Sequence, residues 1–439
     1  MRKKIEKAIN NRIVAPVQLF MGQEKSGGIV LGLSVLLALL LANSAWGDAY
    51  HHLLEQKLGF VFDDTAYLNY SLHHWINDGL MSVFFFVVGL ELKREFIGGE
   101  LSNPRNTILP IGAALGGMVV PALVYMLLNH STATAAGWGI PMATDIAFAL
   151  AVVYLLGDRV PVAVKVFLTT LAIVDDLGAV LIIALFYTSE ISMGNLMIGF
   201  GFLSLMFIAN KLGVKNVLFY LVVAFVGVWT AFLLSGIHAT IAAVLSAFMV
   251  PADSSMSENV YVQRLKKHLK DFLEADGNEV RLLEEEQVEI LSQIKNDATQ
   301  AIPPLQRLEH RMASLVTFVV LPIFAVANAG VSFVGMDVSG LLSTPVMAGV
   351  AFGLLIGKPL GVVGFTWLLV KMGMAKLPDG FTMRHLLGLG FLASIGFTMS
   401  MFVSTLALSQ GEWLVQAKVG IFAASLVGGC LGYWLLKKA

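Results

Sequence analysis

The sequence has little charge. Only 13% of its 439 residues are Asp, Glu, Lys or Arg, about half the share of an average soluble protein, whereas 57% are apolar. A soluble domain covers its surface with polar groups, so this composition excludes an ordinary cytosolic enzyme, a disordered chain and a nucleic-acid binder with a basic face. The composition is typical of a polytopic membrane protein.

Cysteine is nearly absent as well. The single residue, Cys430, excludes an internal disulfide and a cysteine-based metal cluster. The nine histidines lie mainly in loops, without a ligand pattern. A string that resembles a phosphate loop, at 353–359, has the wrong spacing and carries a proline where Ser or Thr is needed. We therefore expect no cofactor, no nucleotide and no nucleic acid among the ligands and partners.

Long apolar runs are abundant. Twelve have roughly the length that a membrane-spanning helix needs. They lie at 27–44, 76–98, 107–129, 139–157, 162–187, 192–210, 216–232, 234–250, 312–333, 345–370, 384–408 and 413–436. Only a short turn divides the seventh run from the eighth, so hydropathy alone also permits eleven or thirteen spans.

Loop charges predict the orientation. Lys and Arg cluster at 2–12 and after the second, fourth, sixth, tenth and twelfth runs. The intervening loops carry mostly acids, namely Asp48, Asp63, Asp64, Glu190, Asp337 and Glu412. Basic loops stay in the cytoplasm, so both termini are predicted to be cytoplasmic and the number of spans even. A cleaved signal peptide is a less favoured interpretation of the first run, because spans follow throughout.

Two segments fall outside the spans of what we expect to be a single membrane domain, 1–439. Segment 253–306 is too charged for the membrane and has helical spacing on both sides of a break at 275–278. We predict a charged cytoplasmic helical insert there, either a solvated appendage or a regulatory element. The loop 45–75, with aromatic residues around Asp63 and Asp64, predicts an extracytoplasmic β-hairpin or a plain connector.

Four ionisable residues lie well inside apolar runs: Asp145, Asp175, Asp176 and Lys358. Such groups are costly in the membrane and often mark ion paths. One Asp and one Lys are equally explained by a structural salt bridge, but three carboxylates facing one amine leave an excess that packing does not need. Adjacent helical residues point about 100° apart, so one of Asp175 and Asp176 is expected to pair with Lys358 while the other faces water.

Buried carboxylates bind either a proton or a small hard cation. Competition of Na+ and H+ for the same carboxylates is all that an exchanger needs. Glycine and proline interrupt two of the apolar runs, the fourth at Gly137, Gly139 and Pro141 and the eleventh at Gly388, Gly390 and Gly396. Interrupted helices in both halves of a transporter indicate a midplane site, although glycines also permit close helix packing. Asp145 and Lys358 are candidates to compensate the exposed helix ends.

Eight motifs occur in an order found in one transporter family. They are Trp75–Met81, Val88–Glu95, Ala143–Ala149, Ala172–Gly178, Gly236–Thr240, Ala327–Gly330, Gly353–Gly361 and Ile395–Ser400. By these motifs the chain resembles the NhaA-type Na+/H+ antiporters over nearly everything except 253–306. The resemblance implies an all-α polytopic protein of about twelve transmembrane helices, with inverted-repeat topology and crossing discontinuous helices in spans 4 and 11. It further implies a homodimer in the bacterial inner membrane.

The resemblance also implies roles for the buried residues. Asp175 and Asp176 form the Na+ and proton site, and Thr144 lends an oxygen near the cation. Asp175 exchanges its partnership with Lys358 as protons come and go, while Asp145 and Lys358 balance the ends of the broken helices. The family extrudes Na+ or Li+ against more than one inward proton by alternating access, which is electrogenic and serves pH and Na+ homeostasis.

The family places pH-responsive residues at its cytoplasmic mouth. The matching positions are Glu91, Arg94, Glu95, His238, Glu309 and His310. The charged residues near the end of the second span are equally explained as interfacial anchors, and His238 as a satisfied interior histidine.

Other functions remain open. Within transport, the alternatives are a K+/H+ exchanger and Na+-coupled uptake of an organic acid, although the buried lysine and the small polar inventory argue against a large organic substrate. A different class is an intramembrane aspartyl protease, which also needs two buried aspartates. Such enzymes place the pair on separate helices, whereas Asp175 and Asp176 are contiguous.

Overall fold

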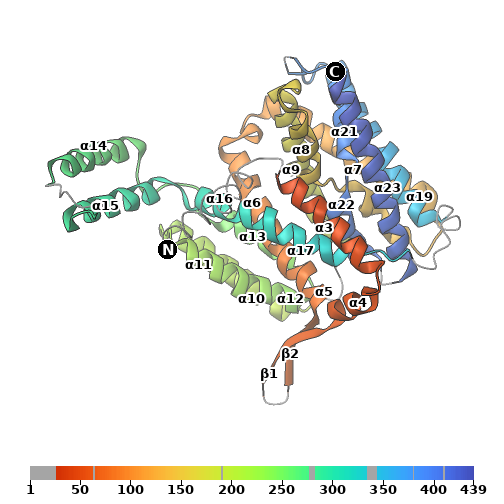
Figure 1. The fold of residues 1–439 in the computed structure, drawn as a ribbon, viewed down its shortest axis with the longest axis horizontal. Coiled ribbons are helices and arrows are strands. Elements are labelled where there is room, and N and C mark those ends of the chain that lie inside the picture. Colours follow the sequence, from red (N-terminus) through yellow and green to blue (C-terminus); the bar gives the residue numbers. More distant parts are fainter. Residues whose placement is uncertain are drawn as a thin grey trace, which may run out of the picture.

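The computed structural model describes residues 26–62, 65–188, 191–275, 282–333, 344–378, 380–408 and 411–439. Figure 1 shows most of them as helices packed side by side, with a hairpin of strands and a hairpin of helices projecting from the body. Within these ranges nine helices are long and apolar enough to cross a membrane, and up to eleven if each of two bent pairs is one span. A predominantly helical polytopic membrane protein is thus confirmed, while the count of twelve stays a prediction.

The first half of the chain carries the three buried aspartates of the predicted site. Its elements are α3 (Ser26–Ala42), α4 (Gly47–Glu55), β1 (Lys57–Phe62), β2 (Thr65–Ser71), α5 (Leu72–His74), η2 (Trp75–Leu80), α6 (Met81–Gly98), η3 (Glu100–Ser102), α7 (Pro104–Asn129), η4 (Ala135–Met142), α8 (Ile146–Leu155), η5 (Gly157–Arg159), α9 (Val162–Phe186) and α10 (Met193–Lys211). The elements α5, η2 and α6 join into one long apolar helix, Leu72–Gly98.

The second half repeats this pattern of joined helices. Its elements are α11 (Val217–Val222), η6 (Val223–Val228), α12 (Trp229–Ser235), α13 (Ala239–Met249), α14 (Glu258–Glu274), α15 (Glu285–Ala301), α16 (Pro304–Leu315), η7 (Val316–Val320), α17 (Leu321–Asn328), α19 (Pro345–Phe352), η8 (Gly353–Gly357), α20 (Lys358–Lys371), α21 (Met383–Ala393), α22 (Phe397–Ala407) and α23 (Glu412–Lys437). Three long spans arise by joining: Val217–Ser235, Pro304–Asn328 and Pro345–Lys371.

Two predicted spans are short in the structure. Run 27–44 corresponds to α3, which has 17 residues, and run 234–250 corresponds to α13, which has 11 residues. At 1.5 Å per residue, α13 is about 16 Å long, roughly half the thickness of the hydrocarbon core. Gly236 ends the preceding helix in the left-handed conformation, with φ of 85°, which glycine adopts without a Cβ clash.

The helices contain π-helical turns that the sequence pattern did not predict. Segments η2, η6, η7 and η8 each lie inside a long apolar helix. A π turn inserts an extra residue into the helical repeat and so rotates the side chains that follow it. Segment η8 ends directly before Lys358 and therefore helps to set the direction of that side chain.

The two interrupted runs are broken in the structure. In the fourth, 139–157, the 3-10 segment η4 ends at Met142, and α8 begins at Ile146 after three residues outside any helix. In the eleventh, 384–408, helices α21 and α22 meet at an angle of 44° around Ser394. The peptide groups at these breaks lack helical partners and must bond elsewhere.

Close contact of α7 with α20 brings Lys358 into the interior. A Cβ atom at Gly361 would collide with the backbone oxygen of Gly116, and a Cβ at Gly116 would collide with that of Gly361. Only glycine permits this approach of the two backbones. Lys358 lies about one turn before Gly361 and is fully buried.

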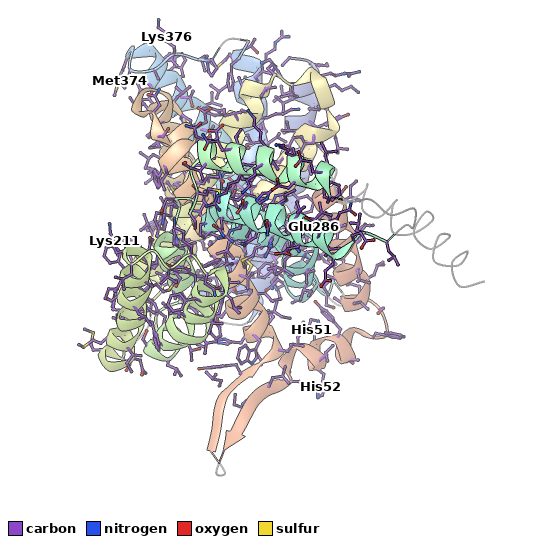
Figure 2. The ribbon with its side chains drawn as sticks, turned by 90° about the vertical axis from the view of Figure 1, so that its left-hand side faces the viewer. His51, His52, Lys211, Glu286, Met374 and Lys376 are labelled. Carbon is purple, nitrogen blue, oxygen red and sulfur yellow. The ribbon has the colours of Figure 1, made fainter. Side chains whose placement is uncertain are left out.

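Both segments outside the membrane runs have regular structure. Within 45–75, strands β1 and β2 pair antiparallel, with Lys57 opposite Ser71. Within 253–306, α14 and α15 pack against each other as a helical hairpin (Figure 1). Figure 2 shows Met374 and Lys376 at the end of the molecule opposite the β-hairpin. Several residues used for the predictions lie outside the described ranges: 2–12 (with the proposed signal-peptide start), Asp63, Asp64, Glu190, 276–278 and Asp337.

Candidate ion-binding site

A buried ion pair joins α9 to α20. Lys358 Nζ lies 2.6 Å from Asp175 Oδ2, and neither side chain has measurable exposure. The same ammonium group donates a hydrogen bond to the backbone oxygen of Met142, at the end of η4. Of the two adjacent aspartates, Asp175 is therefore the one that faces the lysine.

Asp176 faces a cavity instead. Its residue is only 1% exposed, and its Oδ1 has no hydrogen-bond partner among the described residues. The carboxylate lines a cavity of about 240 Å³ together with Glu91 of α6 and residues of α3, α8, η7 and α17. A buried carboxylate oxygen without a donor is costly unless water, a proton or a cation meets it. The structure thus separates the two aspartates by their partners, as their angular spacing on a helix requires.

Asp145 caps two broken helices at once. Its Oδ1 accepts the backbone N–H of Phe148 in α8 at 3.1 Å. Its Oδ2 accepts the backbone N–H of Thr398 in α22 at 3.0 Å and the Thr398 hydroxyl at 2.5 Å. A carboxylate at a helix N-terminus satisfies free N–H groups and compensates the positive end of the helix dipole. One side chain performs this function for both breaks.

Residues 144 and 145 of the first break also donate hydrogen bonds to backbone oxygens of the second. Asp145 N–H donates to Ile395 O at 2.6 Å, and the Thr144 hydroxyl donates to Ala393 O at 2.9 Å. Thr144 lies beside the Asp175 carboxylate as well. The non-helical residues of the fourth and eleventh runs therefore form one hydrogen-bonded unit next to the buried ion pair.

The candidate pH-response residues fall into two groups. Arg94 lies 3.0 Å from both Glu95 and Glu309 (Nη2 to Oε1 and Nε to Oε1), which links α6 to α16. His310 follows Glu309 and is exposed. Glu91, one helical turn before Glu95 and also on α6, lines the Asp176 cavity. These five residues thus lie around the same pair of helices.

His238 lies apart from the other five residues, and its role in a pH response stays a prediction. Its Nε2 is 2.9 Å from Tyr187 O, at the end of α9. It precedes α13, whose opposite end is held by Lys93, which donates to the backbone oxygens of Phe248 and Val250. The motif comparison could not separate it from the others, because α13 is short and its direction was not known.

Sequence reasoning missed two features of this region. Thr398 lies within the motif 395–400, but nothing in that motif indicated that its N–H and hydroxyl both bond Asp145. Asn77 and Asn328 also lie within matched motifs, and the structure joins them by a hydrogen bond of 2.7 Å from Asn328 Nδ2 to Asn77 Oδ1. A polar amide inside an apolar run is the signal that would have found Asn77 and Asn328. No comparable signal marks Thr398.

Comparison with known proteins agrees with this architecture. Residues 18–436 match the profile of the family described as Na+/H+ antiporter 1. The Na(+)/H(+) antiporter NhaA of Oleidesulfovibrio alaskensis is 47% identical over 428 residues, which cover 97% of this chain and 94% of the relative. The Na(+)/H(+) antiporter NhaA 1 of Saccharophagus degradans is 45% identical over 430 residues, with coverage of 97% and 92%.

The resemblance inferred from the motifs is therefore confirmed. Members of this family are transporters rather than enzymes, so the intramembrane-protease alternative is wrong. The matched range extends across both halves of the chain and includes Asp145, Asp175, Asp176 and Lys358. The chain belongs to the Na+/H+ antiporter 1 family, whose curated members here are named NhaA.

Proposed function

We propose that this protein extrudes Na+ or Li+ in exchange for protons, and that the ions compete for Asp175 and Asp176. The observation that carries the proposal is the difference between the two adjacent aspartates. Asp176 is buried with an unbonded oxygen in a cavity, directly beside an aspartate that holds a lysine at 2.6 Å. Carboxylate oxygens match the needs of a small hard cation, and a protonated carboxylate cannot hold one.

The exchange cycle follows from these contacts. A cation that enters the cavity meets Asp176 first and draws Asp175 away from Lys358, while Thr144 supplies a further oxygen. A buried ammonium group that is separated from its carboxylate loses its proton, so cation binding releases one proton from Asp176 and one from Lys358. When two protons return, Asp176 becomes neutral, Lys358 regains its charge and pairs with Asp175 again, and the cation leaves. Two groups that change protonation for one Na+ make the cycle electrogenic, so the membrane potential also drives it.

Alternating access is proposed to move the two breaks as a unit. The Asp145 carboxylate holds the N-terminal ends of α8 and α22 together. The Thr144 hydroxyl and the Asp145 N–H bond the backbone oxygens of Ala393 and Ile395, at the end of α21 and in the break that follows it. A rigid unit of this kind presents the same site to either side without exposing free peptide groups to lipid.

The wider organisation belongs to the same proposal. We infer twelve spans with inverted-repeat topology and with crossing broken helices in spans 4 and 11. The protein is proposed to lie in the bacterial inner membrane as a homodimer. Both termini are then cytoplasmic. The α14–α15 insert then lies on the cytoplasmic side and the β-hairpin on the other. The Arg94–Glu309 contact supports a pH response there, because it joins a helix of the cavity to the helix that follows the insert.

Purified protein in sealed proteoliposomes with an imposed pH gradient tests the proposal. Addition of Na+ or Li+ should dissipate the gradient, and Asp176→Asn should abolish this response while retaining a monodisperse protein. Asp48→Asn, which changes an exposed acid in α4, is the matched control and should exchange normally. Full exchange by Asp176→Asn would overturn the site assignment. Dissipation by K+ alone would overturn the cation assignment in favour of a K+/H+ exchanger.

A further inference from the structure

A second buried polar cluster lies toward the β-hairpin end of the bundle. Asn328 at the end of α17 donates to Asn77 Oδ1 at 2.7 Å, and His73 Nε2 lies 3.1 Å from Asn328 Oδ1. Asn77 and Asn328 are buried. His73 and Asn77 lie one turn apart on the same long helix, Leu72–Gly98, whereas Asn328 comes from the second half of the chain. We call Asn77, Asn328 and His73 the polar layer. Hydrogen-bonded amides inside an apolar bundle provide a route that ions and water can use.

Aromatic side chains close the bundle between this layer and the Asp176 cavity. Phe402 packs against Phe85 with ring centroids 5.5 Å apart and against Phe324 at 6.3 Å. All three rings are completely buried. On α17 the order is explicit, because Leu321 lines the cavity, Phe324 belongs to the aromatic contact, and Asn328 follows one turn later. One turn is about 6 Å, so the polar layer lies just beyond the closure.

Lys418 of α23 is an unpaired cation on the hairpin side of this closure. Its residue is 8% exposed, and no carboxylate lies within ion-pair distance of it in the part of the chain that the structure describes. Its charge acts on His73 of the polar layer. Figure 1 shows the C-terminal end of α23 far from the β-hairpin, so Lys418, near the start of the helix, lies on the hairpin side.

The carboxylate nearest to the polar layer, Asp78, has imidazole neighbours. Asp78 Oδ2 lies 3.1 Å from His74 Nε2, and His238 also acts on the Asp78 carboxylate. On α23 itself, Glu412 is exposed at the first turn. Among the residues that the structure describes, Lys418 is therefore a cation without a carboxylate partner at this end, whereas Glu91 and Asp176 line the cavity at the other end. A cation that moves from the Asp176 cavity to the polar layer therefore leaves carboxylates behind and approaches an ammonium group.

We propose that Lys418 lowers the affinity for Na+ when the ion site opens toward the β-hairpin, and so gives the transporter a sided affinity. The proposal rests on Na+/H+ exchange as the function. A cation released through the polar layer is repelled by the ammonium group, which favours its release and opposes its rebinding. A unit charge at about 10 Å through an effective dielectric constant of about 20 changes a binding constant roughly tenfold.

Membrane vesicles of both orientations test this inference. Everted vesicles present one face to added Na+ and right-side-out vesicles present the other, so the apparent KM for Na+ is measured separately at each face from Na+-dependent proton movement. The wild type should have the higher KM at the hairpin face. Lys418→Met should lower that KM about threefold to tenfold and leave the KM at the opposite face unchanged. Lys418→Arg, which keeps the charge, should behave like the wild type.

Lys437→Met is the matched control, because it removes an exposed lysine from the other end of the same helix, and it should change neither KM. If Lys418→Met lowers expression or thermal stability, the comparison with Lys418→Arg still isolates the charge. Equal KM values at both faces of the wild type, or a Lys418→Met effect that is absent or the same at both faces, would overturn the inference. A wild type without any Na+-dependent proton movement would instead overturn the proposed function.

Discussion

Lys358 and Asp175 form an ion pair of 2.6 Å with no exposed side-chain surface on either partner. Removing two charges from water is costly, and a pair of this kind compensates the cost only while both partners are present. The backbone oxygen of Met142 bonds the same ammonium group. The pair therefore links α9 to α20 beside the breaks, and any event that separates Lys358 from Asp175 leaves buried charges uncompensated there.

Lys358→Met should destabilise the protein strongly, because it leaves Asp175 as a buried charge without a partner. The free energy of unfolding should fall by about 3–5 kcal/mol, measured by thermal or chemical unfolding of the purified protein in detergent. The double variant Asp175→Asn with Lys358→Met should recover much of that loss, since it removes both charges.

Lys371→Met provides the control for this cycle. Lys371 ends the same helix, α20, and is exposed, so its removal should change stability by less than about 1 kcal/mol. Additive losses in the double variant would contradict the pairing.

The Asp145 carboxylate should contribute more to the free energy of unfolding than any one of its hydrogen bonds does, because it caps α8 and α22 together. Asp145→Ala should cost about 2 kcal/mol or more, whereas Thr398→Val, which removes only the hydroxyl bond, should cost about 1 kcal/mol. Thr405→Val is the matched control on α22, where the hydroxyl bonds only the nearby Phe402 O. Unfolding midpoints of the three variants give the order, and a loss in Thr398→Val as large as that in Asp145→Ala would argue against a shared cap.

The four ionisable residues of the site were predictable from sequence because a charge inside an apolar run stands out against its surroundings. The partner of each of these residues was predictable only in part. The 100° between Asp175 and Asp176 required different partners, and the family resemblance named Asp175 as the partner of Lys358. The residue pattern alone left this choice open, because the direction of the Lys358 side chain also depends on the π turn η8 that precedes it. Thr398 escaped detection for a similar reason, since its bond to Asp145 spans the two halves of the chain. The position of His238 likewise depends on tertiary packing.

Glu91 should tune how the site responds to pH. It lines the same cavity as Asp176, so its negative charge attracts both Na+ and protons toward that carboxylate. Glu91→Gln should raise the KM for Na+ and, because proton competition weakens as well, shift half-maximal exchange to lower pH by up to about one unit. The measurement is the pH profile of Na+-dependent proton movement in proteoliposomes.

Glu100→Gln is the control for that profile, since Glu100 lines a different cavity near the end of α6. Its profile should match the wild type. A shift of Glu91→Gln to higher pH would contradict the electrostatic argument.

The contact between α14 and α15 should depend on one buried carboxylate. Asp297 of α15 is 7% exposed, and its oxygens lie 3.2 Å from Arg264 Nη1 and 3.2 Å from His268 Nε2, both on α14. Asp297→Ala leaves these donors facing each other without an acceptor, so the two helices should separate more often and limited proteolysis within 253–306 should accelerate about tenfold or more. Glu274→Ala removes an exposed acid whose ion-pair partner among the described residues is Lys270, and it should leave the cleavage rate unchanged. Equal cleavage rates for Asp297→Ala and the wild type would mean that apolar packing alone holds the hairpin together.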